Sequence, residues 1–169
     1  MPLRPGRCYR RIKGPPYTRL EYIKSNPPVI VKKFEDGNVH GDFPVKLHLI
    51  VLGYGQIRAN ALEAARMAAI KYLEKEVGKS NYHFKLRVYP HHILRENKMI
   101  AGAGADRLQE GMRLAFGDPI GRAARVRMGQ PVITVRTYPQ FIDKVKEALR
   151  RAKYKLPFPC RIIIEQEKK

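Results

Sequence analysis

The sequence predicts an α+β fold of two layers, in which two helices pack on one face of a mixed β-sheet. Short apolar segments typical of strands occur before, between and after two longer segments whose apolar residues recur at helical spacing. The 169 residues also contain no internal repeat and no linker long enough to divide the chain. We therefore expect a single domain at residues 25–169 with a mobile loop at about 97–117, preceded by an arm at residues 1–24.

Strands are predicted where apolar residues form short runs or alternate with polar ones. The clearest alternation is YHFKLRVY at residues 82–89. The turn EDGN ends the first strand, and Gly129 and Gln130 should join the fourth and fifth strands in a hairpin. The candidate strands are residues 28–35, 46–52, 82–89, 123–128, 131–138 and 160–166.

The first helix is predicted to begin at Asn60, which can cap its first turn, with Glu63 completing a capping box and Gly78 as the stop. The second helix follows Pro139, which suits a first helical turn. Each helix has an apolar stripe that should face the sheet. These stripes are Leu62, Ala65, Ala69, Leu73 and Val77 in the first helix, and Phe141, Val145, Leu149 and Ala152 in the second.

Positive charge is the strongest compositional signal. The chain has 34 Lys and Arg against 15 Asp and Glu, a net charge of +19. A folded domain of this charge repels itself unless it binds a polyanion, and nucleic acid is the usual one. An anionic membrane surface is the rival partner. However, the sequence has no Trp, no helix with a bulky apolar face, and no apolar run near the ~18 residues of a membrane span.

The charge is concentrated at both ends and around the loop. The arm mixes basic residues with Pro and Gly, so we expect it to be disordered until a partner orders it; the alternative is a solubilising tail. Tyr9 and Tyr17 favour the first interpretation, because aromatic rings among arginines suit base or sugar stacking. The candidate RNA-binding residues are Arg4, Arg7, Arg10, Arg11, Lys13, Arg19, Arg95, Lys98, Arg122, Arg125, Arg127, Arg150, Arg151, Lys153 and Lys155.

The segment at residues 97–117, NKMIAGAGADRLQEGMRLAFG, has few residues that could build a core. It belongs to a stretch of roughly thirty residues without clear secondary structure, whereas ordinary loops have ~4–6. A flexible basic loop of small residues can enter a narrow space lined by RNA. The alternative is a mobile surface excursion with no binding role.

No pattern of catalytic, metal-binding or cofactor-binding residues stands out. Cys8 and Cys160 lie at opposite ends of the chain, which suggests a reduced cytosolic pair, and the start of the chain lacks the apolar core of a signal peptide. The five histidines have no ligands at metal-binding spacing, and the acidic residues are scattered singly. We therefore expect no enzyme activity, no metal and no cofactor.

The turn Gly53-Tyr54-Gly55 imitates a dinucleotide-binding fingerprint, since it follows a strand and leads into a helix. Arg58 stands at the third glycine position, where its bulk would obstruct close packing of helix on sheet. A simple tight turn is therefore the expected structure.

Four segments together resemble a family of large-subunit ribosomal proteins, the archaeal and eukaryotic branch called L-ten-e, whose bacterial relatives are called L-sixteen. The resemblance covers nearly the whole chain in order, and ADRLQ-x-GMR-x-AFG is its most specific part. The segments are RPGRCYR (4–10), ANALEAARMAAIKYL (59–73), KMIAGAGADRLQEGMRLAFGDPIGRAARVRMGQ (98–130) and EALRRAKYKLP (147–157).

The resemblance implies a sandwich with a hammerhead-like strand arrangement and a structural role in the cytoplasmic ribosome. It implies binding to large-subunit rRNA near the base of the central protuberance, with the arm from Arg4 to Arg19 entering the rRNA. It also implies that the loop from Ala101 to Arg113 projects toward the acceptor arms of tRNA and the peptidyl transferase region. A role late in subunit assembly is plausible by analogy. Eukaryotic members continue beyond the point where this sequence stops, at EQEKK.

The residues expected near tRNA are Gly102, Gly104, Asp106, Arg107, Gln109, Gly111 and Arg113. The expected partners are large-subunit rRNA, tRNA in the ribosome and neighbouring ribosomal proteins, with no membrane and no dedicated homo-oligomer. Two alternatives remain open at this stage. One is a free-standing tRNA- or RNA-binding factor, and the other is an RNA-directed hydrolase or nucleotidyl enzyme.

Overall fold

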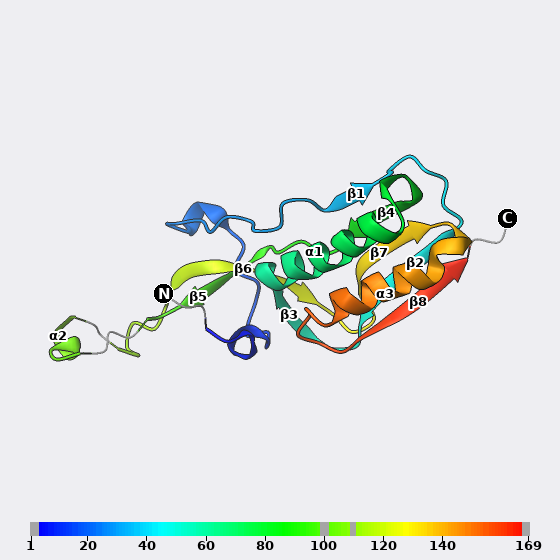
Figure 1. The fold of residues 1–169 in the computed structure, drawn as a ribbon. Helices are drawn as coiled ribbons and strands as arrows, with labels where there is room; N and C mark the ends of the chain where they lie inside the picture. The colour runs from blue at the N-terminus through cyan, green and yellow to red at the C-terminus, as the bar shows by residue number, and fades with distance from the viewer. Residues whose placement is uncertain (1–3, 99–101, 109–110, 167–169) are drawn as a thin grey trace.

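The computed structural model describes residues 4–98, 102–108 and 111–166, and it has the predicted α+β class. Helices cover one face of the larger of two β-sheets, and a two-stranded extension projects away from this body (Figure 1). The strands are β1 (Glu35–Gly37), β2 (Val45–Val51), β3 (Gly55–Arg58), β4 (Tyr82–Leu86), β5 (His92–Glu96), β6 (Asp118–Val126), β7 (Pro131–Thr137) and β8 (Cys160–Gln166). The helices are α1 (Ala59–Glu76), α2 (Ala105–Leu108) and α3 (Ile142–Lys153), and the 3₁₀ turns are η1 (Gly6–Tyr9), η2 (Leu20–Tyr22), η3 (Lys79–Asn81) and η4 (Pro139–Phe141).

The larger sheet has five strands in the order β1-β4-β7-β2-β8, and α1 and α3 lie together on one of its faces (Figure 1). Burial alternates along β2, where Leu47 and Leu49 are fully buried and His48 is not. The inward residues of the strands and helices form one hydrophobic core, as the two predicted apolar stripes require. All described strand pairings are antiparallel, so the sheets are not of the mixed type expected.

Helix α1 begins differently from the prediction. Arg58 is its N-cap residue, with no side-chain capping bond, and the Asn60 Oδ1 atom is buried without a hydrogen-bond partner in the described structure. Glu63 is unavailable for a capping box because it forms a two-pronged ion pair with Arg66, at 2.6 and 2.9 Å. The predicted end is confirmed, since the Gly78 N–H donates to the Leu73 carbonyl at 3.1 Å and Gly78 has φ +83°.

The first predicted strand, residues 28–35, is wrong. Pairing with β4 begins only at Glu35, opposite Lys85, and continues to Gly37. The observed strand therefore lies within the segment EDGN, which the sequence predicts to be a turn. Pro27 and Pro28 have no N–H to contribute to a ladder, so this part of the chain runs alongside the body instead. One backbone bond ties it there, from the Leu86 N–H to the Phe34 carbonyl at 2.7 Å.

A second, smaller sheet has the strand order β3-β6-β5. The predicted hairpin at Gly129 is therefore wrong, because β6 belongs to the small sheet and β7 to the large one. The turn is held by the end of β2. The Gly129 N–H donates to the Val51 carbonyl at 2.8 Å, and the Val51 N–H donates to the Gln130 carbonyl at 3.1 Å. The turn thus carries the chain from one sheet to the other.

Strands β5 and β6 form the extension, and the segment between them leads to α2 at its far end (Figure 1). Residues that the sequence leaves without secondary structure, His92–Glu96 and the first half of β6, are therefore paired strands. Within the described part of the chain, no helix is both long and apolar enough to cross a bilayer.

The chain approaches itself closely where the ladder of β5 and β6 ends toward the tip, and this contact leads to a prediction. A Cβ atom on Gly117 would overlap the backbone of Glu96 and Asn97, whereas a Cβ on Gly121 would meet open space. Gly117→Ala should therefore destabilise the extension by about 1–3 kcal/mol, whereas Gly121→Ala should be neutral or slightly stabilising. Amide hydrogen exchange across β5 and β6 measures both changes. Equal protection in the two variants would contradict the assigned geometry.

Candidate nucleic-acid interface

The N-terminal arm lies across the small sheet and uses both of its edges. At the β3 edge, the Gln56 N–H donates to the Arg10 carbonyl at 3.0 Å. At the β5 edge, the Ile93 N–H donates to the Tyr17 carbonyl at 3.0 Å. Edge strands expose backbone groups of this kind that have no partner inside the sheet. The sequence predicts that the arm is disordered until a binding partner orders it. In the structure, the edges of the small sheet already provide hydrogen bonds to the arm backbone.

Arg125 holds the arm between these two edges. It projects from β6, the central strand of the small sheet, and donates to the Gly14 carbonyl at 2.8 Å and to the Pro15 carbonyl at 3.1 Å. The planar guanidinium suits this task, because its fork of N–H groups reaches two neighbouring carbonyl oxygens at once. Arg125 therefore acts first as a clamp on the arm.

Two further arginines bind backbone oxygens in the same way. Arg58 donates to the Arg4 carbonyl at 2.9 Å. Arg122 donates to the Pro27 carbonyl at 2.8 Å and to the Asn26 side chain at 2.7 Å. Of the residues predicted to bind RNA, Arg122 and Arg125 thus have much of their hydrogen-bonding capacity committed within the protein.

His92 completes the attachment of the arm. Its Nδ1 atom accepts the Tyr17 N–H at 2.9 Å, with an Arg125 nitrogen at 3.4 Å. Burial, followed by the neighbouring charges of Arg125 and Arg95, lowers the pKa of His92 to about 4. The ring is therefore neutral at pH 7, and because Nδ1 is an acceptor its proton lies on Nε2.

Glu96, at the end of β5, ties the arm to the extension. It forms an ion pair with Arg4 at 2.5 Å and accepts the Tyr9 hydroxyl at 3.3 Å. Burial and the Glu96 carboxylate raise the pKa of Tyr9, so its hydroxyl stays protonated and remains a donor.

An aromatic cluster lies beside this ion pair, around Arg95 of β5. The Arg95 guanidinium lies 3.7 Å from the Phe116 ring centroid, and Tyr17 meets Phe116 edge-on at 5.7 Å.

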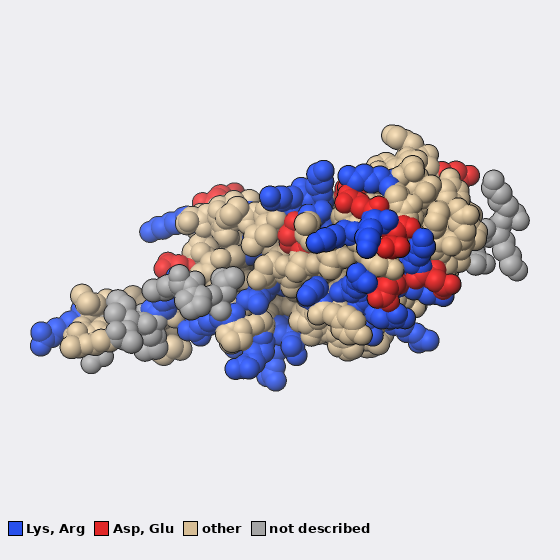
Figure 2. Space-filling view, in the orientation of Figure 1, with Lys and Arg blue, Asp and Glu red and all other residues tan. Residues whose placement is uncertain are grey.

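The docked arm carries five of the predicted cations at exposed positions. Arg7, Arg10, Arg11, Lys13 and Arg19 are all exposed. Figure 2 shows Lys and Arg gathered around η1 at the lower centre of the molecule, with acidic residues mostly interspersed among basic ones over the helices. We call this group of exposed arm cations the arm patch.

The segment after α3 adjoins the arm patch. The Arg10 guanidinium lies 6.0 Å from the ring centroid of Phe158, and the same ring packs against Gly53 and Gly55. A Cβ on Gly55 would collide with Phe158 and with the Arg10 carbonyl, which explains the glycines of this turn by close packing. The strands flanking the turn, β2 and β3, belong to different sheets, so no nucleotide-binding βαβ unit exists here.

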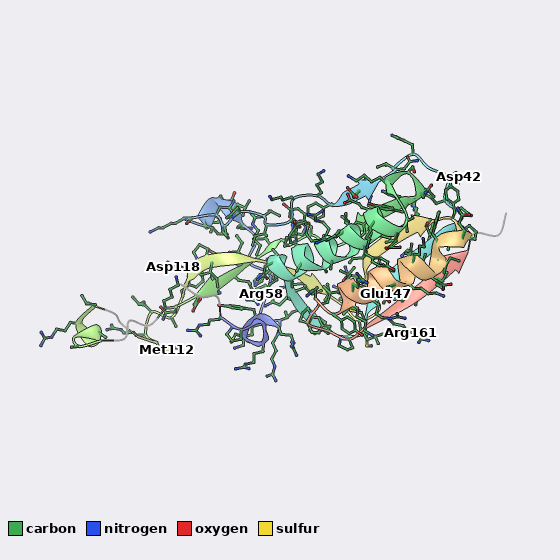
Figure 3. All side chains as sticks on the ribbon, viewed as in Figure 1. Asp42, Arg58, Met112, Asp118, Glu147 and Arg161 are labelled. Carbon is green, nitrogen blue, oxygen red and sulfur yellow. The ribbon has the colours of Figure 1, made fainter. Side chains whose placement is uncertain are left out.

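The predicted cations of α3 lie on the helical layer. Arg150 and Arg151 both pair with Glu147, and Arg151 lies 4.1 Å from the ring centroid of Tyr72 on α1. Lys153 and Lys155 are exposed nearby. Figure 3 shows Glu147 on α3, Arg161 on the neighbouring strand β8, and Arg58 close to the arm.

The far end of the extension carries the residues expected near tRNA. A Cβ atom added to Gly102, Gly104 or Gly111 would meet open space, and Arg107 and Arg113 are exposed. Gln109 lies outside the described residues, as does the side chain of Asp106. Leu108, Met112, Leu114 and Phe116 are also exposed, by 67–76%. Figure 3 shows Met112 well beyond Asp118, toward the tip. The tip thus contributes little to any core.

Sequence reasoning missed three residues that build this surface. Gln56 and Arg58 of β3 and His92 of β5 hold the arm, yet in the sequence they lie far from it and match no motif. Only the docked geometry identifies them. Apart from Arg122 and Arg125, which are partly buried, the predicted cations are exposed, and their RNA-binding role stays a prediction.

The described residues contain no group of three or more His, Cys, Asp and Glu side chains that could hold a metal ion. Cys8 is exposed and Cys160 is buried, and neither forms a disulfide. The structure therefore brings together cations and aromatic rings rather than a reactive constellation.

If Arg125 holds the arm on the small sheet, its removal should loosen the arm. Arg125→Ala removes two bonds from the charged guanidinium to carbonyls, so the amides of Gln56 and Ile93, which bind the arm, should exchange about ten- to a hundredfold faster. Arg127→Ala is the matched control, since it removes the same charge from an exposed position after β6. Unchanged exchange in Arg125→Ala would show that the clamp does not hold the arm.

Comparison with known proteins identifies the family. A family model described as "Ribosomal protein L16p/L10e" matches residues 12–163. Large ribosomal subunit protein uL16 of Thermofilum pendens is 64% identical, and the match covers 98% of this chain and 99% of that protein. The proteins of the same name from Staphylothermus marinus and Pyrobaculum neutrophilum are 59% and 57% identical, over 98% of this chain and 95% and 93% of their own lengths. The chain therefore belongs to the L16p/L10e family and is a structural, non-enzymatic protein of the large ribosomal subunit, as the resemblance predicted.

Proposed function

We propose that the chain binds large-subunit rRNA through the docked arm and helps to position aminoacyl-tRNA near the peptidyl transferase region through the tip of the extension. The observation that supports this most is the arm patch. Five exposed cations stand on a segment whose backbone is bonded to the small sheet. The expected site of binding is near the base of the central protuberance.

Affinity in this proposal comes mainly from phosphate neutralisation. Each Lys or Arg that contacts a phosphate releases counterions, so binding weakens steeply as salt concentration rises. With roughly 6–10 such contacts, affinity should fall by ~10³–10⁵ between 50 and 200 mM salt. Arginine and tyrosine add forked phosphate contacts and stacking, which lysine alone does not supply.

The tip has a different role in the proposal. It is an exposed projection with three glycines, and its two described cations, Arg107 and Arg113, lie beyond the paired part of β5 and β6 (Figure 1). A projection of this shape can reach a tRNA while the rest of the protein stays on rRNA. The catalytic chemistry of peptide transfer is left to the rRNA.

Charge reversal in the arm patch tests the rRNA contact. Arg7, Arg10 and Arg11 changed together to Glu should weaken association with large-subunit rRNA and lower the slope of log affinity against log salt by about two to three. Filter binding or fluorescence anisotropy over a salt series measures this. The control changes Lys33, Lys71 and Lys75 to Glu, which alters the net charge equally at exposed positions away from the arm patch. An equal loss in both variants would argue against a specific interface.

Removal of the tip tests the tRNA role. Replacing residues 101–113 with a short Gly-Ser linker should leave the unfolding temperature almost unchanged, because the described side chains there are mostly exposed. Large subunits reconstituted with this variant should be slower in tRNA-dependent steps, measured by aminoacyl-tRNA accommodation. A collapse of thermal stability would instead show that the tip is a structural part of the fold. If the wild-type protein bound small RNAs but had no affinity for large subunits, this result would instead favour a free-standing RNA-binding factor.

A further inference from the structure

A cavity of about 400 Å³ lies between the arm and strands β3 and β5. Four of its lining residues are cations, contributed by both the arm and the sheet: Arg7, Arg11, Lys13 and Arg95. The cavity is also lined by Tyr9 and Tyr17, and none of its lining residues is acidic. Its volume lies within the range of pockets that hold small ligands, and it far exceeds the space needed by a bare phosphate ion.

The inner wall of the cavity carries a buried polar group without a partner. Gln56 is only 6% exposed, and its Nε2 atom donates to the Arg11 carbonyl at 3.1 Å. That bond fixes the orientation of the amide and leaves Oε1 buried with no hydrogen-bond partner in the described structure. Buried oxygens of this kind are rare, because losing water without gaining a donor costs free energy. Because Gln56 lines the cavity, a ligand donor that reaches this oxygen would supply the missing partner.

His92 adds the complementary group. Its Nδ1 atom is occupied by the Tyr17 N–H, so its Nε2–H is the ring's remaining donor, and the neutral ring adds no charge to the cavity. The lining of the cavity thus combines cations, aromatic rings, an amide and a neutral imidazole whose Nε2–H is a donor. Cations alone would suit any anion, whereas this combination suits a ligand that has an anionic part, a flat part and polar edges.

We infer that the cavity binds one unpaired ribonucleotide of the rRNA, with its phosphate on the rim cations and its base or ribose against the Tyr, Gln56 and His92 side chains. A nucleotide has all the required parts, because its bases stack on aromatic rings and its base edges and 2′-hydroxyl supply donors and acceptors. The inference rests on the proposed function and makes it more specific. The arm patch then does more than neutralise phosphates, since it closes one side of a nucleotide-sized site.

The first test uses the intact protein and adenosine monophosphate as the probe. In NMR titrations, the nucleotide should shift the His92 ring and Gln56 side-chain signals saturably, and inorganic phosphate at the same ionic strength should leave the Gln56 signals in place. If phosphate shifts the same signals as strongly as the nucleotide does, the cavity holds anions without recognising a nucleotide. Absence of any saturable shift would equally overturn the inference.

Two charge-matched variants make the test specific. Lys13→Gln removes a cation that lines the cavity, whereas Lys24→Gln removes an exposed cation of the arm that does not line it. Lys13→Gln should weaken nucleotide binding about tenfold, the usual effect of losing one charged hydrogen bond, and Lys24→Gln by less than about twofold. The remaining amide signals confirm that both variants are folded. Equal weakening would show that only overall charge matters.

Binding of wild-type protein to large-subunit rRNA separates this inference from the proposed function. Salt-sensitive rRNA binding without any response to the nucleotide would overturn the cavity alone. Absence of rRNA binding by the wild-type protein would overturn the proposed function, and with it the inference.

Discussion

The candidate interface depends on the pairing of the arm with both edges of the small sheet. The arm has prolines at positions 2, 5, 15 and 16, which supply no N–H, so it is poorly suited to building a ladder of its own. The sheet supplies what is missing through the Gln56 and Ile93 amides and the Arg125 guanidinium. This pairing sets the arm cations in place before RNA binds, so less of the binding free energy is spent on ordering the chain.

Arginines in this protein have two different tasks. Arg58, Arg122 and Arg125 bind backbone carbonyls or an amide oxygen and hold segments that are distant in sequence. The arm cations, by contrast, are exposed and available to a polyanion. The total charge of +19 therefore overstates the number of groups free for RNA. Lysine could not replace the clamps, because it lacks the rigid fork that reaches two oxygens.

The sequence predicts individual helices and strands better than it predicts which strands pair with one another. Both helices and the strands around residues 46–52, 82–86, 131–137 and 160–166 follow from apolar periodicity, which depends only on near neighbours. The division into two sheets does not follow, because the Gly129 turn looks like a hairpin and only its bonds to Val51 show otherwise. For the candidate site, charge identified the arm from the sequence, whereas Gln56 and His92 join the arm only through the fold.

The central claim is that the docked arm faces rRNA in the large subunit. It is tested most directly by ultraviolet cross-linking of intact large subunits, followed by mass spectrometry of the protein's RNA-linked peptides. The account predicts nucleotides attached to peptides within residues 4–19, with Tyr9 and Tyr17 among the modified side chains. Cross-links confined to the helical layer, with none from the arm, would contradict it.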